Sequence, residues 1–276
     1  MATFAQPTGY QLMRSAEAAK IVIPAPNKFI DGFVIRGRWS VAQSKKNGPF
    51  DFTRERTAID KLTAQGKSYQ LEMFAGVHAP DWIGGVNAQF SPTFRKAYEK
   101  LAAAMGKAFG GDANLTAVHC CLPMNTSPEF RLDGTALCKA GWVNDALNAN
   151  GLGLIALAKA FPRCVIVANL HNPSGNASDG FAVQQIEQGR RLLGKQFAVQ
   201  ENSFKADPAH KTYNLYKIVQ QHVADGFPAG YEQVEDSSAS RYGGSFAGSL
   251  GQLGKAQWLI VYEKDVPNIK KPWAQK

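Results

Sequence analysis

Residues 31–35 and 69–75 are two apolar segments separated by a helical stretch, and each is followed by polar and aromatic residues. Arg36 and Trp39 follow the first segment, and Trp82 lies in the loop after the second. Two buried strands joined by a helix form a parallel β-α-β unit. Parallel α/β folds place their functional sites at the carboxyl ends of the strands. This unit therefore predicts a parallel sheet and also the edge at which its polar residues gather.

The same alternation of apolar segments and helical stretches continues along the chain. Eight strands are predicted, at residues 9–13, 31–35, 69–75, 115–122, 164–170, 196–200, 229–234 and 258–262. Helices are predicted at residues 16–22, 53–65, 91–109, 134–148, 153–161, 182–193, 213–224 and 245–253. Eight such units with no Pro- or Ser-rich linker predict a closed (β/α)8 TIM barrel rather than an open sheet.

The composition agrees with one barrel domain over residues 1–276, with a short N-terminal arm at about 1–8 and a basic tail at about 266–276. Hydrophobic residues make up 45% of the chain, which supplies a sizeable core. The net charge is +9, but Lys and Arg are dispersed, which favours a solvated basic surface over a nucleic-acid site. An acidic polysaccharide or a neighbouring subunit stays open as an anionic partner.

The N-terminal residues lack the apolar core of a signal peptide, and no apolar stretch is long enough to span a membrane. We expect a soluble protein made in a reducing cytoplasm, with no membrane partner; incorporation into an oligomer or a larger assembly such as a virion stays open. The four cysteines show no Cys-x-x-Cys spacing, and no nucleotide-binding glycine motif is present. We therefore expect no metal and no cofactor.

Polar and aromatic side chains follow nearly every predicted strand. They are Arg36, Arg38 and Trp39; Glu72, His78, Asp81 and Trp82; Asn125 and Glu129; His171 and Asn172; Glu201 and Asn202; Glu232, Glu235 and Asp236; and Glu263 and Asp265. Tryptophan faces stack on the C–H surfaces of sugar rings, while Asn, His and Arg bind hydroxyl groups. This inventory favours a carbohydrate ligand.

Three motifs in residues 30–83 follow one another in an order that resembles (β/α)8-barrel glycoside hydrolases of the β-galactosidase-like type, clan A. They are Trp39-Ser40, the turn Gly48-Pro49-Phe50-Asp51-Phe52, and Pro80-Asp81-Trp82. The resemblance implies cleavage of a β-linked sugar by a retaining mechanism, with two carboxyl groups about 5–5.5 Å apart.

The resemblance also implies where the two carboxyl groups lie. The acid/base follows strand four, which makes it Glu129, and the nucleophile ends strand seven, which makes it Glu232, with Glu235 as the alternate. The substrate-binding residues would be Arg36, Trp39, Glu72, His78, Trp82, Asn125 and Asn202. This sequence departs from the family pattern of Asn followed directly by Glu, because Glu129 comes four positions after Asn125.

Several of these residues have a structural alternative. Glu72 alternates with Leu71 and Met73, so it is predicted to face the barrel interior, where it would bind substrate or pair with Arg36 or Arg38. Trp39 and Trp82 would equally pack the barrel mouth, His119 is a candidate core histidine, and Glu263 and Asp265 read as surface charges.

A second hypothesis is a catalytically degenerate member, a non-catalytic glycan-binding or structural barrel such as a phage particle component. The displaced Glu129, the lack of an export signal and the high Lys and Arg count favour it.

Overall fold

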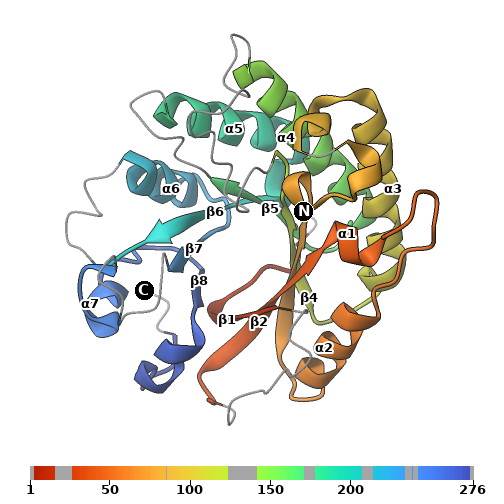
Figure 1. Ribbon diagram of the computed structural model, residues 1–276. Helices are drawn as coiled ribbons and strands as arrows, with labels where there is room; N and C mark the ends of the chain where they lie inside the picture. Colours follow the sequence, from red (N-terminus) through yellow and green to blue (C-terminus); the bar gives the residue numbers. More distant parts are fainter. Residues whose placement is uncertain are drawn as a thin grey trace.

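The computed structural model describes residues 3–15, 27–84, 86–123, 142–170, 178–206, 214–233, 238 and 242–273. Eight parallel strands follow one another around a closed barrel, and β1 completes the circle by pairing with β8. Helices lie outside the barrel around its circumference (Figure 1). The prediction of a single (β/α)8 barrel is confirmed.

The strands are β1 (Gly9–Ser15), β2 (Ile30–Arg38), β3 (Ser68–Phe74), β4 (Leu115–Cys120), β5 (Val165–Leu170), β6 (Phe197–Phe204), β7 (Ala229–Gln233) and β8 (Trp258–Val261). The α-helices are α1 (Trp39–Ala42), α2 (Thr53–Thr63), α3 (Pro92–Phe109), α4 (Trp142–Ala160), α5 (Ser178–Leu193), α6 (Asn214–Ala224) and α7 (Phe246–Leu250). Short 3₁₀ helices are η1 (Gly76–His78), η2 (Asp81–Ile83), η3 (Val86–Phe90), η4 (Gly194–Gln196) and η7 (Glu263–Asn268).

Helix α3 begins where its capping residues predict. The Ser91 side chain accepts a hydrogen bond from the backbone nitrogen of Phe94 at 3.2 Å, and Pro92 occupies the first helical position. None of the helices in the described ranges is both long and apolar enough to cross a membrane.

Helix α4 corrects one prediction, because two helices were expected where the structure has one continuous helix. Gly151, between the two predicted helices, and Gly153, at the start of the second, do not break the helix; they allow close packing. A Cβ at Gly153 would lie 2.7 Å from the sulfur of Cys120, and one at Gly151 would lie 2.9 Å from the Gln188 amide. Residues 134–141 of the helix predicted at 134–148 lie outside the described residues, as does the whole helix predicted at 16–22.

The hydrophobic core has two parts. The larger part fills the space between barrel and helices, with Leu71, Phe109 and Leu259 among its buried members. The smaller part fills the lower lumen, at the amino ends of the strands. Its buried residues, here called the apolar layer, are Val34, Ala117, Val165, Val167, Ala198, Trp258 and Ile260. Because successive strand residues point to opposite faces, β2, β4, β5, β6 and β8 contribute buried residues to both parts.

The N-terminal arm belongs to this core rather than lying free of it. Ala5 forms a parallel bridge with Cys164, just before β5, and Phe4 packs against the apolar layer. The backbone nitrogen of Ala5 donates to the Arg163 carbonyl at 2.8 Å, and that of Val165 donates to the Ala5 carbonyl at 3.0 Å. The arm therefore covers the lower end of the lumen.

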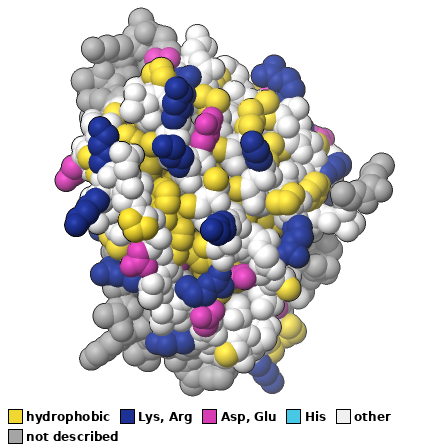
Figure 2. All heavy atoms as spheres, turned by 90° about the vertical axis from the view of Figure 1, so that its right-hand side faces the viewer, with side chains coloured by type: hydrophobic (Ala, Val, Ile, Leu, Met, Phe, Trp, Pro, Cys, Tyr) yellow, Lys and Arg dark blue, Asp and Glu magenta, His cyan; other side chains and the backbone are white. Residues whose placement is uncertain are grey.

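The segment after β8 also packs more closely than a solvated tail would. Asp265 is 1% exposed and accepts a hydrogen bond from the Gln233 amide at 3.1 Å. The expectation that Asp265 is a surface charge is therefore wrong, because η7 places it against Gln233 at the carboxyl end of β7. Glu263 is exposed, as expected. Basic side chains elsewhere are scattered, as Figure 2 shows for the face on the right-hand side of Figure 1.

Candidate functional site

The upper lumen, at the carboxyl ends of the strands, is lined by polar side chains. Along β2, β5 and β6 the lumen-facing residue changes from Val34 to Arg36, from Val167 to Asn169 and from Ala198 to Gln200. Residues two apart on a strand share a face, so this change divides the lumen into two levels. The hydrogen-bonded polar side chains of the lumen are here called the polar layer. They are Arg36, Gln70, Glu72, His119, Asn169, Gln200, Asn202 and Glu232, of which Gln70 lies lowest, in register with Val34.

Arg36 joins two carboxylates across the polar layer. Its Nη2 donates to both carboxylate oxygens of Glu232 at 2.9 Å, and its Nε donates to Oε2 of Glu72. The Arg36 side chain keeps 17% exposure, against 3% for Glu232 and none for Glu72. Burial alone would lower the pKa of Arg36, but the charges of Glu232 and Glu72 outweigh it and raise the pKa above its ordinary value.

Glu72 is held from its other side by β5 and β4. Its Oε1 accepts from the Asn169 amide nitrogen at 3.1 Å, and Oδ1 of Asn169 lies 3.0 Å from Nδ1 of His119. The His119 ring is buried, which lowers its pKa against the smaller, opposing effect of the Glu72 charge. The predictions that Glu72 faces the lumen and that His119 is a satisfied core histidine are confirmed, and Glu72 pairs with Arg36.

Glu232 is supported from β6 and β8. The Gln200 amide nitrogen donates to Glu232 at 3.3 Å and to Asn202 at 2.9 Å, while Oε1 of Gln200 accepts from the Trp258 indole at 2.9 Å. A Cβ at Gly230 would lie 2.0 Å from the Trp258 ring, so only glycine leaves space for the indole. Trp258 thus belongs to the apolar layer and is also hydrogen-bonded to the polar layer.

Trp39, expected to stack on a sugar, lies in the core instead. Its indole is fully buried, with ring centroids 5.3 Å from Phe94 and 6.1 Å from Tyr98, and its nitrogen donates to Gln43 at 3.2 Å. The reason is that Trp39 begins α1, beyond the end of β2, and there its indole packs against α3, whereas Arg36 faces the lumen.

Other expected residues lie around the polar layer. His78, in η1, is half-buried and stacks on Phe74 with ring centroids 5.5 Å apart. The Arg36 guanidinium carbon also lies 5.5 Å from the Phe74 ring centroid, so one aromatic ring contacts both side chains. Trp82, in η2, is half-buried against the core. Asn202 is 6% exposed and bound to Gln200.

Three candidate residues, Asn125, Glu129 and Glu235, lie outside the described residues, as do His171, Asn172 and Asp236. Sequence reasoning missed Gln70, Asn169, Gln200 and Trp258 as site residues. A usable signal was present, because each polar member of this set occupies a lumen-facing position on a predicted strand. Within the described ranges, no three His, Cys, Asp or Glu side chains converge as a metal site would require.

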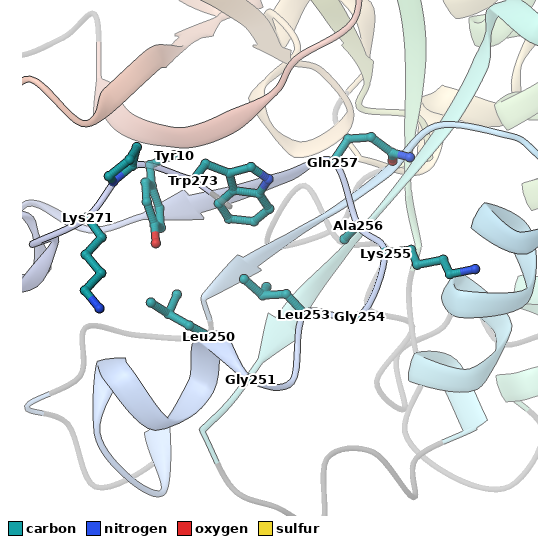
Figure 3. A pocket seen from close by; sticks show the side chains of 11 residues that line it. Tyr10, Leu250, Gly251, Leu253, Gly254, Lys255, Ala256, Gln257, Lys271 and Trp273 are labelled. Carbon is teal, nitrogen blue, oxygen red and sulfur yellow. The ribbon is translucent and has the colours of Figure 1, made fainter. Parts of the chain in front are cut away.

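A cavity of about 460 Å³ lies elsewhere, near the amino ends of β1 and β8. Figure 3 shows Tyr10 and Trp273 on one side of it and Leu250 and Leu253 on the other. The Tyr10 and Trp273 rings meet edge to face at 5.1 Å. This cavity is distinct from the polar layer, since its strand residues come from the opposite ends of the strands.

No family model matches this chain, and no curated protein matches its sequence. Solved structures match its fold. The catalytic domain of β-amylase from Paenibacillus polymyxa has a TM-score of 0.62 at 11% identity, over 98% of this chain and 97% of that chain.

Two further structures match at similar levels. Endo-glycoceramidase II from Rhodococcus sp., in a cellobiose-like imidazole complex, gives a TM-score of 0.60 at 10% identity, over 99% of this chain and 77% of that chain. A thermostable mutant of the xylanase Xyn10A from Cellvibrio japonicus gives 0.60 at 11%, over 92% and 86%. This chain therefore shares its (β/α)8 fold with the barrel glycoside hydrolases.

Proposed function

We propose that this protein is a glycoside hydrolase that cleaves a β-linked sugar by double displacement, with Glu232 as the nucleophile and Glu129 as the acid/base. The observation that carries the proposal is the Arg36–Glu232 ion pair in the polar layer. A nucleophilic carboxylate must be ionised and held in place, and a guanidinium donating to both of its oxygens favours the ionised form. The pair lies at the carboxyl ends of the barrel strands, and parallel α/β folds have their active sites at these ends.

The two steps of the reaction assign a role to each carboxyl group. Glu232 attacks the anomeric carbon while the bond to the leaving oxygen breaks and Glu129 gives that oxygen its proton. Glu129, now ionised, takes a proton from water, and the water oxygen attacks the same carbon and releases Glu232. In the glycosyl ester Glu232 carries no charge, and Glu72 still balances the charge of Arg36.

Substrate contacts would come from residues around the polar layer. Arg36, which keeps part of its surface exposed, and His78 would bind hydroxyl groups, together with Asn125 and Asn202. Trp82 would stack on a sugar ring. We leave Trp39 out, because its indole is fully buried.

The direct test is Glu232→Gln, assayed on a panel of activated aryl β-glycosides. We expect kcat to fall by several orders of magnitude, since an amide cannot form the glycosyl ester. A 2-deoxy-2-fluoro glycoside with a good leaving group should add one glycosyl mass to the wild-type protein and none to the variant. Glu263→Gln, at an exposed carboxylate beyond β8, is the matched control and should behave as wild type. Equal turnover by Glu232→Gln and wild type contradicts the assignment.

A second candidate is a barrel that binds glycan without cleaving it. The observation that favours it is the low exposure of Glu232, whose two oxygens both accept from Arg36, as in a structural ion pair. The same panel separates the two functions. No turnover and no trapped sugar, together with glycan binding measured by calorimetry, would favour the binding protein.

A further inference from the structure

Hydrogen bonds in the polar layer can be assigned a direction, starting from Arg36. A guanidinium has donors only, so the Arg36 contact fixes Oε2 of Glu72 as an acceptor. In its ion pair with Arg36, Glu72 is a carboxylate, and both oxygens of a carboxylate can only accept. The fully buried Glu72 therefore needs a second donor at Oε1.

Asn169 is the residue that supplies this donor. Its amide nitrogen lies 3.1 Å from Oε1 of Glu72. The reverse orientation would set two acceptor oxygens against each other, so the amide has one allowed orientation. Its oxygen then faces Nδ1 of His119 at 3.0 Å and has to accept from it. His119 must therefore carry a proton on Nδ1.

The remaining nitrogen of His119 settles the direction of the next contact. A neutral ring with its proton on Nδ1 can only accept at Nε2, yet the atom 2.8 Å away is Oε1 of Gln70. The Gln70 amide nitrogen, meanwhile, has no hydrogen-bond partner among the described residues. A 180° turn of the Gln70 amide leaves its shape unchanged and brings that nitrogen to His119 as a donor. The alternative is an imidazolium ring, which keeps the Gln70 nitrogen unpartnered.

We propose that His119 and Asn169 are positioning residues: His119, neutral with its proton on Nδ1, orients Asn169, which holds Glu72 and through it fixes Arg36 against Glu232. Each hydrogen bond from Gln70 to Glu72 then runs in one direction, towards the carboxylate. Burial of the ring, which lowers the pKa of His119, agrees with the neutral form. The significance for catalysis rests on the proposed role of Glu232, but the hydrogen-bond chain does not.

The tautomer can be observed without any substrate. In protein labelled with ¹⁵N at histidine, a long-range ¹H–¹⁵N spectrum distinguishes a protonated ring nitrogen from an unprotonated one. The signals of His119 among the five histidines are those lost in His119→Gln. At neutral pH we expect a protonated Nδ1 and an unprotonated Nε2. Two protonated nitrogens, or a proton on Nε2 alone, would overturn the proposal.

The positioning role is tested through exchange of the Arg36 Nε–H with water. In His119→Leu, which cannot donate to Asn169, exchange should be about tenfold faster, as expected for a weakened charge-assisted hydrogen bond. His119→Gln keeps a donor and should retain slow exchange. Val165→Ala, in the apolar layer on the same strand as Asn169 and in register with Ala117 rather than His119, is the control for lost packing and should leave exchange unchanged.

Each outcome of the exchange measurement tests the hydrogen-bond chain from Gln70 to Glu72. Equal exchange in wild type, His119→Leu and His119→Gln overturns the positioning role, and so does fast exchange in both variants. Should His119→Leu fail to fold, the wild-type tautomer and His119→Gln still decide. An inactive wild-type protein would overturn the proposed function while leaving both NMR criteria in force. In an active protein, His119→Leu should lower kcat with little change in KM, and His119→Gln should restore it.

Discussion

The two levels of the barrel lumen stand on the same strands but are held together by different forces. The apolar layer consists of close-packed side chains such as Val34 and Trp258. Their burial is favourable whatever their relative orientation, because the hydrophobic effect is not directional. The polar layer consists of directional contacts around Arg36, whose charges gain little net stability from burial. The lower level thus serves stability, while the upper level maintains one arrangement of charges.

Removing the central charge of the polar layer should have the largest effect. Arg36→Met leaves Glu72 and Glu232 buried without their cation, which should destabilise the fold by about 3–5 kcal/mol at neutral pH. Protonation removes the uncompensated buried charges, so part of the lost stability of the variant returns as the pH falls. Urea unfolding at pH 7 and pH 5 measures this. A loss that is equal at both pH values would mean that the charges do not cause it.

Overfilling the apolar layer should cost less and should be independent of pH. Gly230→Ala brings a methyl group against Trp258, and overpacking of this kind costs about 1–3 kcal/mol. Gly111→Ala is the control, since a Cβ there meets nothing within 4 Å. Equal free energies of unfolding for the two variants would contradict the close contact at Gly230.

A histidine outside the lumen should have a smaller effect, and this effect depends on pH. Burial and the neighbouring Arg190 lower the pKa of His222, in α6, from 6.5 to about 3. Because only the unfolded chain takes up this proton between those values, stability is full above about pH 6.5 and falls as the pH drops towards 3. One group contributes at most about 1.4 kcal/mol per pH unit.

The measurement is the free energy of unfolding between about pH 6 and pH 4.5, for wild type and for His222→Gln, which keeps an acceptor for Arg190. The variant should show a shallower decline. Since His119 is unchanged in both proteins, the difference isolates His222. Parallel declines would show that His222 does not titrate in this way.

Much of the fold was predictable, because buried parallel strands and helix caps such as Ser91 leave local signals. Alternation along one strand also predicted that Glu72 faces the lumen. That rule does not reach Trp39, whose position after the strand suggested the barrel mouth, because the residue begins α1 and packs against α3. The glycines inside α4 looked like helix ends, because the Cys120 sulfur that requires Gly153 lies on another element.

The contacts within the candidate site were less predictable than its residues. Glu72 and Asn169 are 97 positions apart and sit on strands β3 and β5, which are not neighbours in the sheet. Their contact depends on the barrel's closure and on the register of every strand between them. Sequence patterns report which face a side chain occupies, and only the assembled lumen determines its partner.

The pairing of β1 with β8 has a consequence for how the chain reaches its folded state. Gly9 lies beside Trp258, so the final ladder of the sheet joins segments from nearly opposite ends of the sequence. A sheet in which β8 has not yet paired leaves the amide and carbonyl groups along that edge of β1 without strand partners. Such distant pairings slow folding and expose strand edges to aggregation. Until β8 pairs with it, the edge of β1 therefore stays open to contacts with other chains.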